Sequence, residues 1–433
     1  MENTIAQADE LSRRRFVTQA AKSFLGVSIL PWALPKESVA AGLGLNRPLN
    51  HAPKARNVIY LYMAGGMTHI DTFDPKPGAE TGGPTQAIKT KADGVQLAEN
   101  LPLLANHAKK IAVIRGMTST KGAHDQGNYF MHTSYAKRST IRHPGMGAWM
   151  TRLAGRSNPT LPGSVVVSGG SRHPLAGFLP SSHQPLAIGK PDEGLRNSRM
   201  RPGLTEESFK ERLALAEKFD RGFREKYDLK KVRAYSDMYE DAVRLMKSGD
   251  LEAFDINKEP AEVREGYGAE PFGQGVLLAR RLVERQVRFI EVQLGGWDTH
   301  QLNFERVPER CAILDQALSA LLNDLDKRGM LDETLVVLAT EFGRTPNINV
   351  NQGRDHYPKA FSAMLAGGGI RGGQVWGKTD PEGREVIEQR VEIPDFNATI
   401  AYALGLPLDE IVYSPTRRPF TLADKGQPLT KLL

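Results

Sequence analysis

Short apolar runs, each followed by glycine or polar residues, recur along the chain and are typical of buried strands. The runs are 57–63, 111–114, 164–167, 287–294, 334–339 and 360–365. Between the fourth and fifth runs, apolar side chains recur in steps of three and four residues, which predicts an amphipathic helix. These side chains are Cys311, Leu314, Leu318, Leu321 and Leu325. A strand, a helix and a strand in this order favour parallel pairing through a right-handed crossover, so the pattern predicts an α/β fold.

Residues 203–268 differ from the rest of the chain in composition and pattern. They are rich in Glu, Lys, Arg and Leu, and they lack a strand-like run from Thr205 to Lys247. They predict two or three helices inserted before the strand at 287–294. Such helices could form a cap or a packing layer, and packing is the more common use. We find no internal repeat or long linker, so residues 42–433 are expected to form a single domain with this insertion.

The N-terminal residues 1–41 have the order of parts of a twin-arginine signal peptide. A basic Ser12-Arg13-Arg14-Arg15-Phe16-Val17 motif precedes a weakly apolar stretch, and the small residues Val39-Ala40-Ala41 suit a signal peptidase. The alternative is a cytoplasmic amphipathic helix with a basic start. The signal predicts a periplasmic or otherwise exported protein that engages the twin-arginine export machinery and keeps no stable membrane span after signal removal.

Composition sets the broad class of the protein. The chain has 433 residues, of which 40% are hydrophobic and 25% are charged, and these values exclude a disordered, collagen-like or multi-span membrane protein. The formal net charge of +7 is modest and its basic residues are scattered, so nucleic acid is not an expected partner. A mild positive field would suit an anionic substrate, although a solubilising surface would have the same charge.

The single cysteine, Cys311, excludes an internal disulfide, a CxxC redox pair and a thiolate-rich metal site. Any metal must therefore be held by His, Asp and Glu. Ligands of open parallel sheets bind beyond the carboxyl ends of the strands, where the loops converge. The informative residues are consequently those that follow each predicted strand.

Carboxylates and imidazoles follow several of these strands. Asp71 comes after the run 57–63, Asp298 and His300 come after 287–294, and Glu341 follows 334–339, with His356 further along. Together these five residues predict a site for one or two divalent ions, with zinc, calcium and magnesium as the candidates. The alternative is that Asp71 and Asp298 cap helices and that His69 is an ordinary loop histidine.

A polar segment after the run 111–114 offers reactive hydroxyls. Thr118, Ser119 and Thr120 precede Lys121, and hydroxyls beside a basic group could supply a nucleophile and anion contacts. A Ser/Thr-rich helix N-terminus would look the same. Arg344 could clamp an anion through two hydrogen bonds, although a structural ion pair is the more common role of such an arginine.

The order of these motifs resembles the family catalogued as domain of unknown function 1501, twin-arginine-exported bacterial proteins related to the alkaline phosphatase and sulfatase superfamily. The resemblance covers nearly the whole mature chain. It rests on Gly65-Gly66 with Asp71-Thr72-Phe73-Asp74, on Gly296-Trp297-Asp298-Thr299-His300, on Thr340-Glu341-Phe342-Gly343-Arg344-Thr345-Pro346 and on Gly353-Arg354-Asp355-His356. It implies an alkaline-phosphatase-like three-layer sandwich with a largely parallel central sheet. It also implies a metal centre that contains Asp71 or Asp74, Asp298, His300, Glu341 and His356.

The chain departs from the superfamily at two positions. The sulfatase nucleophile motif is absent, and aligning Thr133-Ser134 with its end places His124 where the nucleophile would stand. Phe342 follows Glu341 where the phosphatases have a metal-binding histidine. A formylglycine sulfatase mechanism is therefore not expected.

These observations predict an exported metal-dependent hydrolase of phosphate or sulfate esters, acting on an anionic small molecule or polysaccharide. The nucleophile would be Thr118, Ser119 or Thr120, or a metal-activated water with His124 as general base or acid. The alternative is a non-catalytic protein on the same scaffold that recognises an anionic polysaccharide and keeps one structural ion.

Overall fold

A nine-stranded sheet forms the centre of the protein. The computed structural model describes residues 51–433 except 171, 196–197, 199–202, 204 and 227–241. The strand order is β12 (Gln374–Trp376), β4 (Ile111–Thr118), β11 (Phe361–Ala366), β8 (Thr334–Ala339), β1 (Asn57–Met63), β7 (Phe289–Leu294), β5 (Ser164–Val167) and β6 (Leu186–Ile188), and β15 (Val391–Glu392) also pairs with β4. The predicted targeting segment, residues 1–41, lies outside the described residues.

Most neighbouring strands of this sheet are parallel. β1 lies between β7 and β8 and is parallel to both, with Tyr60 opposite Glu291 on one side and Val337 on the other. Among the described strands of this sheet, only β11 is antiparallel to its neighbours, β4 and β8. The largely parallel sheet predicted from the sequence is therefore confirmed. The carboxyl ends of β1, β4, β7 and β8 meet at one edge of the sheet.

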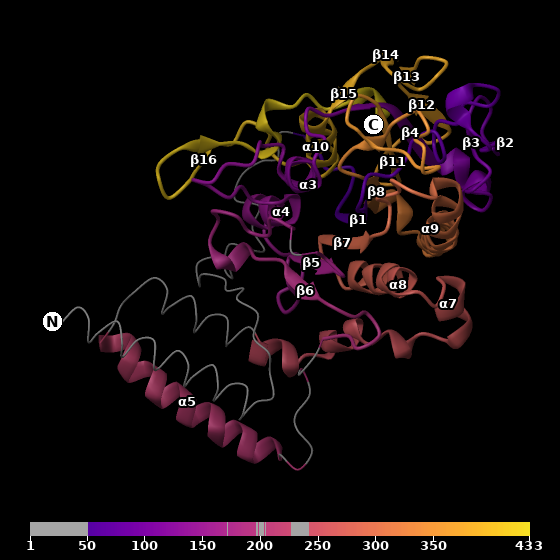
Figure 1. The fold of residues 1–433 in the computed structure, drawn as a ribbon. Coiled ribbons are helices and arrows are strands. Elements are labelled where there is room, and N and C mark those ends of the chain that lie inside the picture. Colours follow the sequence, from indigo (N-terminus) through magenta and orange to yellow (C-terminus); the bar gives the residue numbers. More distant parts are fainter. Residues whose placement is uncertain (1–50, 171, 196–197, 199–202, 204, 227–241) are drawn as a thin grey trace.

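Helices cover both faces of the sheet and complete three layers (Figure 1). Residues alternate between the faces of a strand, so each strand contributes to two cores. Ile59 and Leu61 pack with α8 (Pro271–Glu284) and α9 (Asn303–Lys327), whereas Tyr60 and Tyr62 belong to the core shared with α3 (His124–Thr133), α4 (Met146–Ala154) and α10 (Ile393–Ala403). The sheet thus separates the α8 and α9 layer from the α3, α4 and α10 layer.

The predicted helical insertion contains α5 (Glu206–Lys226), which lies apart from the sheet in Figure 1. It continues with η5 (Gly249–Phe254), η6 (Ile256–Lys258) and α7 (Ala261–Gly266). The remaining elements are the hairpins β2 (Ala87–Lys89) with β3 (Gln96–Ala98), β9 (Gly343–Arg344) with β10 (His356–Tyr357), β13 (Lys378–Thr379) with β14 (Val386–Glu388) and β16 (Val412–Tyr413) with β17 (Pro419–Phe420), and the 3-10 turns η2 (Glu80–Gly82), η3 (Leu104–Lys110), η4 (Ser181–His183), η7 (Leu331–Glu333), η8 (Leu422–Lys425) and η9 (Thr430–Leu432). Whether the insertion caps a site or adds a packing layer stays a prediction.

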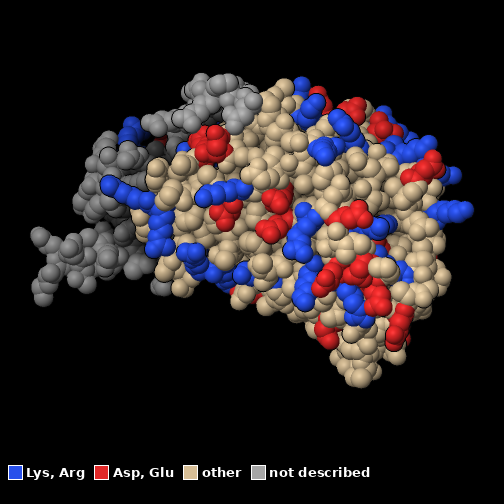
Figure 2. All heavy atoms as spheres, turned by 90° about the horizontal axis from the view of Figure 1, so that it is seen from above, with Lys and Arg blue, Asp and Glu red and all other residues tan. Residues whose placement is uncertain are grey.

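The surface gives no single-sign field on the face that Figure 2 shows. Basic and acidic side chains are interspersed there. A search of the described residues found no helix with both the length and the apolar character that a membrane span requires.

Candidate metal centre

Four polar side chains meet where the carboxyl ends of the parallel strands converge. His124 is the first residue of α3, which follows β4, and Asp298 lies in the loop after β7. His300 belongs to the same loop, and His356 begins β10. Gly65, after β1, has a φ of +122°, and a Cβ added there would lie 2.6 Å from the Asp298 backbone nitrogen. Glycine at this position therefore allows the loops after β1 and β7 to approach each other.

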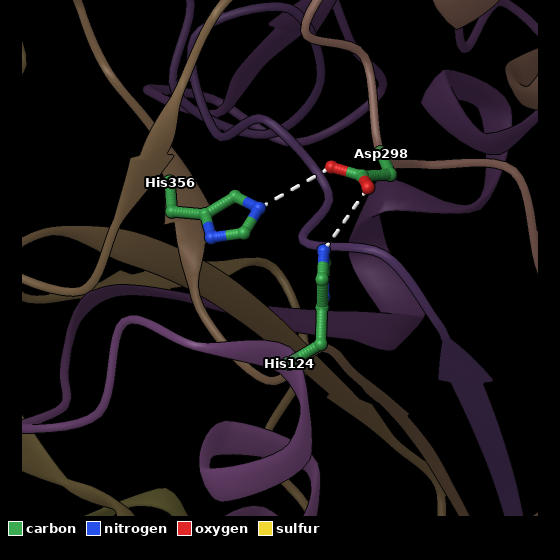
Figure 3. A group of neighbouring side chains, drawn as sticks. All are labelled: His124, Asp298 and His356. Carbon is green, nitrogen blue, oxygen red and sulfur yellow. Dashed lines mark hydrogen bonds and ion pairs between the residues drawn. The ribbon is translucent and has the colours of Figure 1, made fainter.

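The Asp298 carboxylate is the common neighbour of the three imidazoles. Its Oδ2 lies 3.2 Å from His124 Nε2, and its Oδ1 lies 3.2 Å from His300 Nε2 and 3.3 Å from His356 Nε2. The Nε2 atoms of His300 and His356 are 3.0 Å apart. Figure 3 shows the rings of His124 and His356 pointing at the two oxygens of Asp298. We call His124, Asp298, His300 and His356 the candidate metal centre.

The other nitrogen of each ring, Nδ1, faces a carboxylate or a backbone carbonyl. A carbonyl and an ionised carboxylate can only accept a hydrogen bond. The contacts are His124 Nδ1 with Glu341 Oε1 at 2.9 Å, His300 Nδ1 with Asp355 Oδ1 at 2.7 Å, and His356 Nδ1 with the Gly122 carbonyl oxygen at 2.8 Å. Each Nδ1 must therefore carry the proton, and the neutral ring then presents a lone pair at Nε2. An anchored Nδ1–H is the usual arrangement behind a metal-binding histidine.

Neutral rings would thus place three imidazole lone pairs beside the Asp298 carboxylate, with no ring nitrogen to donate among them. Two lone pairs 3.0 Å apart, as at His300 and His356, repel each other unless a cation lies near them. The buried Nε2 of His124 has no hydrogen-bond partner among the described residues. Ligand atoms of His124, Asp298 and His356 all lie within 4.8 Å of one another. The donor set therefore fits a divalent ion.

Arg344 holds Asp298 in place. The guanidinium is fully buried and donates to Asp298 and to the carbonyls of Gly65 and Gly66, as well as to that of Arg354. Burial of Asp298 would raise the pKa of its carboxyl group, but the hydrogen bond and charge of Arg344, with nearby His124 and His300, lower that pKa to about 2. Arg344 thus forms an ion pair that orients a candidate ligand.

Glu341 lies behind His124 and outside the converging Nε2 atoms. It accepts hydrogen bonds from the Tyr62 hydroxyl at 3.0 Å and the Gly65 backbone N–H at 2.9 Å, in addition to His124. The hydrogen bond that His124 donates to Glu341 is the main reason that the pKa of His124 is raised. Burial lowers the pKa of His356. Glu341 is therefore placed to orient His124.

The structure does not bring Asp71 or Asp74 to this cluster. Asp71 is buried and pairs with Arg354 at 2.8 Å, and it also accepts hydrogen bonds from Thr85 at 2.7 Å and Asn303 at 2.9 Å. Asp74 is buried beside Lys76 and Arg115, with its Oδ1 3.0 Å and 3.3 Å from their nitrogens. The donors around them occupy their carboxylate oxygens, so we leave both residues out of the candidate metal centre.

The loop of candidate nucleophiles lies beside the centre. Thr118 ends β4 and donates to the Val391 carbonyl at 3.3 Å, whereas Ser119 accepts the Lys121 backbone N–H at 3.1 Å. Thr120 is exposed. The loop then supplies the Gly122 carbonyl that holds His356 and ends at His124. The hydroxyls are thus near in sequence to the centre, and their role as nucleophiles stays a prediction.

Sequence reasoning missed two features of this region. It assigned His124 to acid–base catalysis, which stays a prediction, and did not foresee that the ring lies beside Asp298 and His356, although the residue begins a helix directly after a polar loop at the sheet edge. It also missed a second, buried group formed by His132, His173 and Glu291. The available signal was Glu291 itself, because a carboxylate within the apolar run of β7 needs a partner.

The protein belongs to the α/β class. Its fold has three layers around a largely parallel sheet, with histidines and a carboxylate at the carboxyl edge of that sheet. Within this class, the chain belongs to the family described as "Protein of unknown function (DUF1501)", whose model matches residues 55–433. No curated protein matches the sequence.

Similar solved structures come from sulfatases and alkaline phosphatase relatives. The PsFucS1 sulfatase from Pseudoalteromonas sp. is 11% identical, with a TM-score of 0.39 and coverage of 86% of this chain and 73% of that one. A protein in the alkaline phosphatase superfamily from Vibrio parahaemolyticus is 10% identical, with a TM-score of 0.37 and coverage of 92% and 79%. Ps i-CgsB in complex with k-i-k-neocarrahexaose is 12% identical, with a TM-score of 0.41 and coverage of 83% and 73%.

Proposed function

We propose that the protein is a metal-dependent hydrolase of phosphate or sulfate esters. The observation that carries the proposal is the convergence of three imidazole Nε2 atoms on the Asp298 carboxylate, each ring being anchored through Nδ1. A donor set with several imidazoles favours zinc or a similar transition ion over calcium and magnesium, which prefer oxygen ligands. A bound ion would polarise the ester and lower the pKa of an attacking water or hydroxyl group.

We assign His124, Asp298 and His356 as the ligands of this ion. Catalytic zinc sites commonly use three protein ligands and leave a further position open. Glu341 orients His124 and Arg344 orients Asp298, so both act through a ligand.

His300 is the proposed general base or acid. Its side chain is 41% exposed, and Asp355 holds its Nδ1–H at 2.7 Å, so Nε2 is the nitrogen that would exchange a proton at the edge of the centre. The attacking group would be water or a hydroxyl of Thr118, Ser119 or Thr120. The substrate would be an anionic small-molecule or polysaccharide ester.

The test compares His356→Ala with His300→Ala in zinc-replete full-length protein. We expect His356→Ala to lose both the ion and turnover, because it removes a ligand. We expect His300→Ala to keep the ion and to lose about 10²–10⁴-fold in kcat, the usual contribution of a general acid or base. Metal content is measured by mass spectrometry, and turnover is measured on aryl phosphate, phosphonate and sulfate esters.

The matched control is His107→Ala, which changes a histidine on η3, outside the candidate metal centre. This variant should keep both ion and activity. Wild-type protein that holds a stoichiometric ion but turns over none of these esters would contradict the hydrolase. Tight binding of a sulfated polysaccharide by that inactive protein would favour the non-catalytic alternative.

We also propose that the protein is exported through the twin-arginine pathway. The support is the motif Ser12-Arg13-Arg14-Arg15-Phe16-Val17 with small residues at Val39-Ala40-Ala41. This route would place the mature domain in the periplasm or beyond.

A further inference from the structure

Glu291 is a carboxylate in the middle of the sheet. It lies in β7, is 1% exposed, and faces the layer that contains α3. Its Oε1 is 3.0 Å from Nε2 of His132, in the last turn of α3, and its Oε2 is 3.2 Å from Nε2 of His173, in the loop after β5. Both histidines are buried. We call these three residues the Glu291 group.

Proton positions in the Glu291 group follow from the outer nitrogens of the two rings. His132 Nδ1 lies 2.7 Å from the Asn128 carbonyl oxygen, so it carries a proton. His132 Nε2 faces the Glu291 carboxylate, and a further proton must lie between them. Burial would lower the pKa of His132, but the charge and hydrogen bond of Glu291 raise it. The pair is therefore an imidazolium and a carboxylate.

His173 has the opposite proton arrangement. Its Nδ1 accepts the Leu175 backbone N–H at 2.9 Å, so the neutral ring carries its proton on Nε2 and donates it to Glu291. A nitrogen that carries a proton cannot bind a metal. Although its atoms are close enough to hold an ion, the Glu291 group thus differs from the candidate metal centre, where every Nδ1 faces an acceptor and the neutral rings would present lone pairs at Nε2.

The Glu291 group joins the two elements that supply His124 and Asp298 to the candidate metal centre. α3 begins at His124 and contains His132 at its other end, whereas β7 contains Glu291 and leads into the loop of Asp298. The distance between His124 Nε2 and Asp298 Oδ2, 3.2 Å, therefore depends on how α3 lies on β7.

We infer that the Glu291–His132 ion pair, braced by His173, is a positioning device that fixes α3 on β7 and so places His124 against Asp298. Glu291, His132 and His173 are positioning residues, since they act through His124. This inference rests on the metal centre of the proposed function.

A second set of contacts ties the same helix to Glu341. Asn128 of α3 donates from Nδ2 to the Tyr62 hydroxyl at 3.2 Å, and that hydroxyl donates to Glu341 at 3.0 Å. The Tyr62 ring lies edge-on to His132, with centroids 4.5 Å apart. α3 is therefore held near its middle and at its end by buried polar contacts, and Glu341 in turn holds His124.

The test measures zinc affinity of the full chain with Glu291→Gln, by competition with a chromogenic chelator. Loss of the charge leaves His132 without its counter-ion, so we expect zinc affinity to fall by about tenfold or more, as for groups that orient metal ligands. Glu291→Asp keeps the carboxylate and should recover part of that affinity. If Glu291→Gln does not fold, His132→Gln with Glu291→Gln removes both charges and takes its place, with the same expected direction.

The matched control is Leu278→Ala in α8, which lies in the core on the opposite face of the sheet. It should lower the melting temperature without changing zinc affinity, which separates positioning from a general loss of stability. Unchanged zinc affinity in folded Glu291→Gln, or an affinity loss of the same size in Leu278→Ala, would overturn the inference. A second ion per chain, lost in Glu291→Gln and kept in His356→Ala, would show instead that the Glu291 group binds metal.

Amide hydrogen exchange gives a readout that needs no ion. Glu291→Gln should raise exchange over His124–Thr133, and Leu278→Ala should not. If the wild-type chain binds no zinc, the proposed function fails, and this exchange pattern still decides whether the Glu291 group fixes α3. Unchanged exchange over α3 in Glu291→Gln would then overturn the inference.

Discussion

At the scale of single residues, Asp298 supplies the negative charge of the candidate metal centre. It faces three imidazoles and accepts from Arg344, and its side chain is 47% exposed. The neighbours that stabilise its ionised form keep it ready for a cation at ordinary pH. Protonation of this one carboxylate would remove both the ion-pair partner of Arg344 and a proposed ligand.

This environment predicts an acid-dependent loss of stability in metal-free protein. Because the pKa of Asp298 is lowered from 3.8 to about 2 in the folded state, its contribution is present above the unfolded pKa and is lost as pH falls through the folded one. The stability advantage of wild type over Asp298→Asn should be constant above about pH 5 and should vanish between about pH 4 and pH 2. Urea unfolding in chelator at stepped pH measures it. If wild type kept its full stability advantage over Asp298→Asn at about pH 2, this account of the Asp298 carboxylate would be wrong.

The sequence revealed some residues of the centre and concealed others for a physical reason. Asp298 and His300 lie in the loop after β7, and His356 begins the short strand β10. The structure brings the three side chains together. Asp71 has the same kind of position, yet Arg354 encloses it in a buried pair. Residue type and spacing do not distinguish a carboxylate that faces the sheet edge from one that accepts an arginine, since the partner is remote in sequence.

At the scale of secondary structure, the close approach of α3 to the loop after β8 shapes the centre. Gly127 lies in α3, and a Cβ added there would meet the Phe342 ring at 2.9 Å and Glu341 Cβ at 3.2 Å. The helix can therefore lie near Glu341 only with a residue that has no side chain. This contact complements the buried pair at the other end of α3.

Gly127→Ala should destabilise the protein despite better helix propensity. Replacing glycine by alanine in a helix gains up to about 1 kcal/mol, whereas overpacking a buried contact costs about 1–3 kcal/mol. Zinc affinity should fall as well, because α3 would move away from Glu341. Denaturant unfolding and zinc titration check both effects.

Gly266→Ala in α7 is the control, since a Cβ there has no atom within 4 Å. It should leave stability unchanged or raise it slightly. Equal stability changes in the two variants would argue that the contact with Phe342 is not what limits this position.

The strand boundaries predicted from the sequence match those of the structure where burial alone determines them. The apolar runs 57–63, 164–167 and 334–339 are β1, β5 and β8. β7 begins at Phe289, later than the run at 287, because Gln286 has a left-handed φ of 64° and the chain is still turning after α8. β4 continues to Thr118, where it pairs with Glu392 of β15. Such tertiary pairing leaves no local mark in the sequence.

At the scale of the whole molecule, the α/β class and the largely parallel sheet could be predicted because strand and helix periodicities are strong and alternate along the chain. The order of the strands could not, since β1 lies between β7 and β8, which are far from it in sequence. The Glu291 group was hidden for a related reason. It needs α3, β7 and the loop after β5 to be packed before its charges have partners.

The export proposal gives a prediction for the complete chain. In a bacterium with twin-arginine machinery, the mature protein should begin after Ala41, and Arg13→Lys with Arg14→Lys should retain the precursor in the cytoplasm. Terminal sequencing and cell fractionation measure this. Appearance of the double variant in the periplasm at the wild-type rate would speak against the pathway.

The candidate ligands His124, Asp298 and His356 come from three distant stretches of the chain and meet only when β4, β7 and the β9–β10 hairpin have docked. An unfolded chain has no equivalent pocket, so the affinity for the ion is added to the free energy that favours the native form. Cation loading would therefore act as a checkpoint of completed folding. For a protein sent across a membrane in its final shape, the ion would be acquired on the cytoplasmic side, before departure.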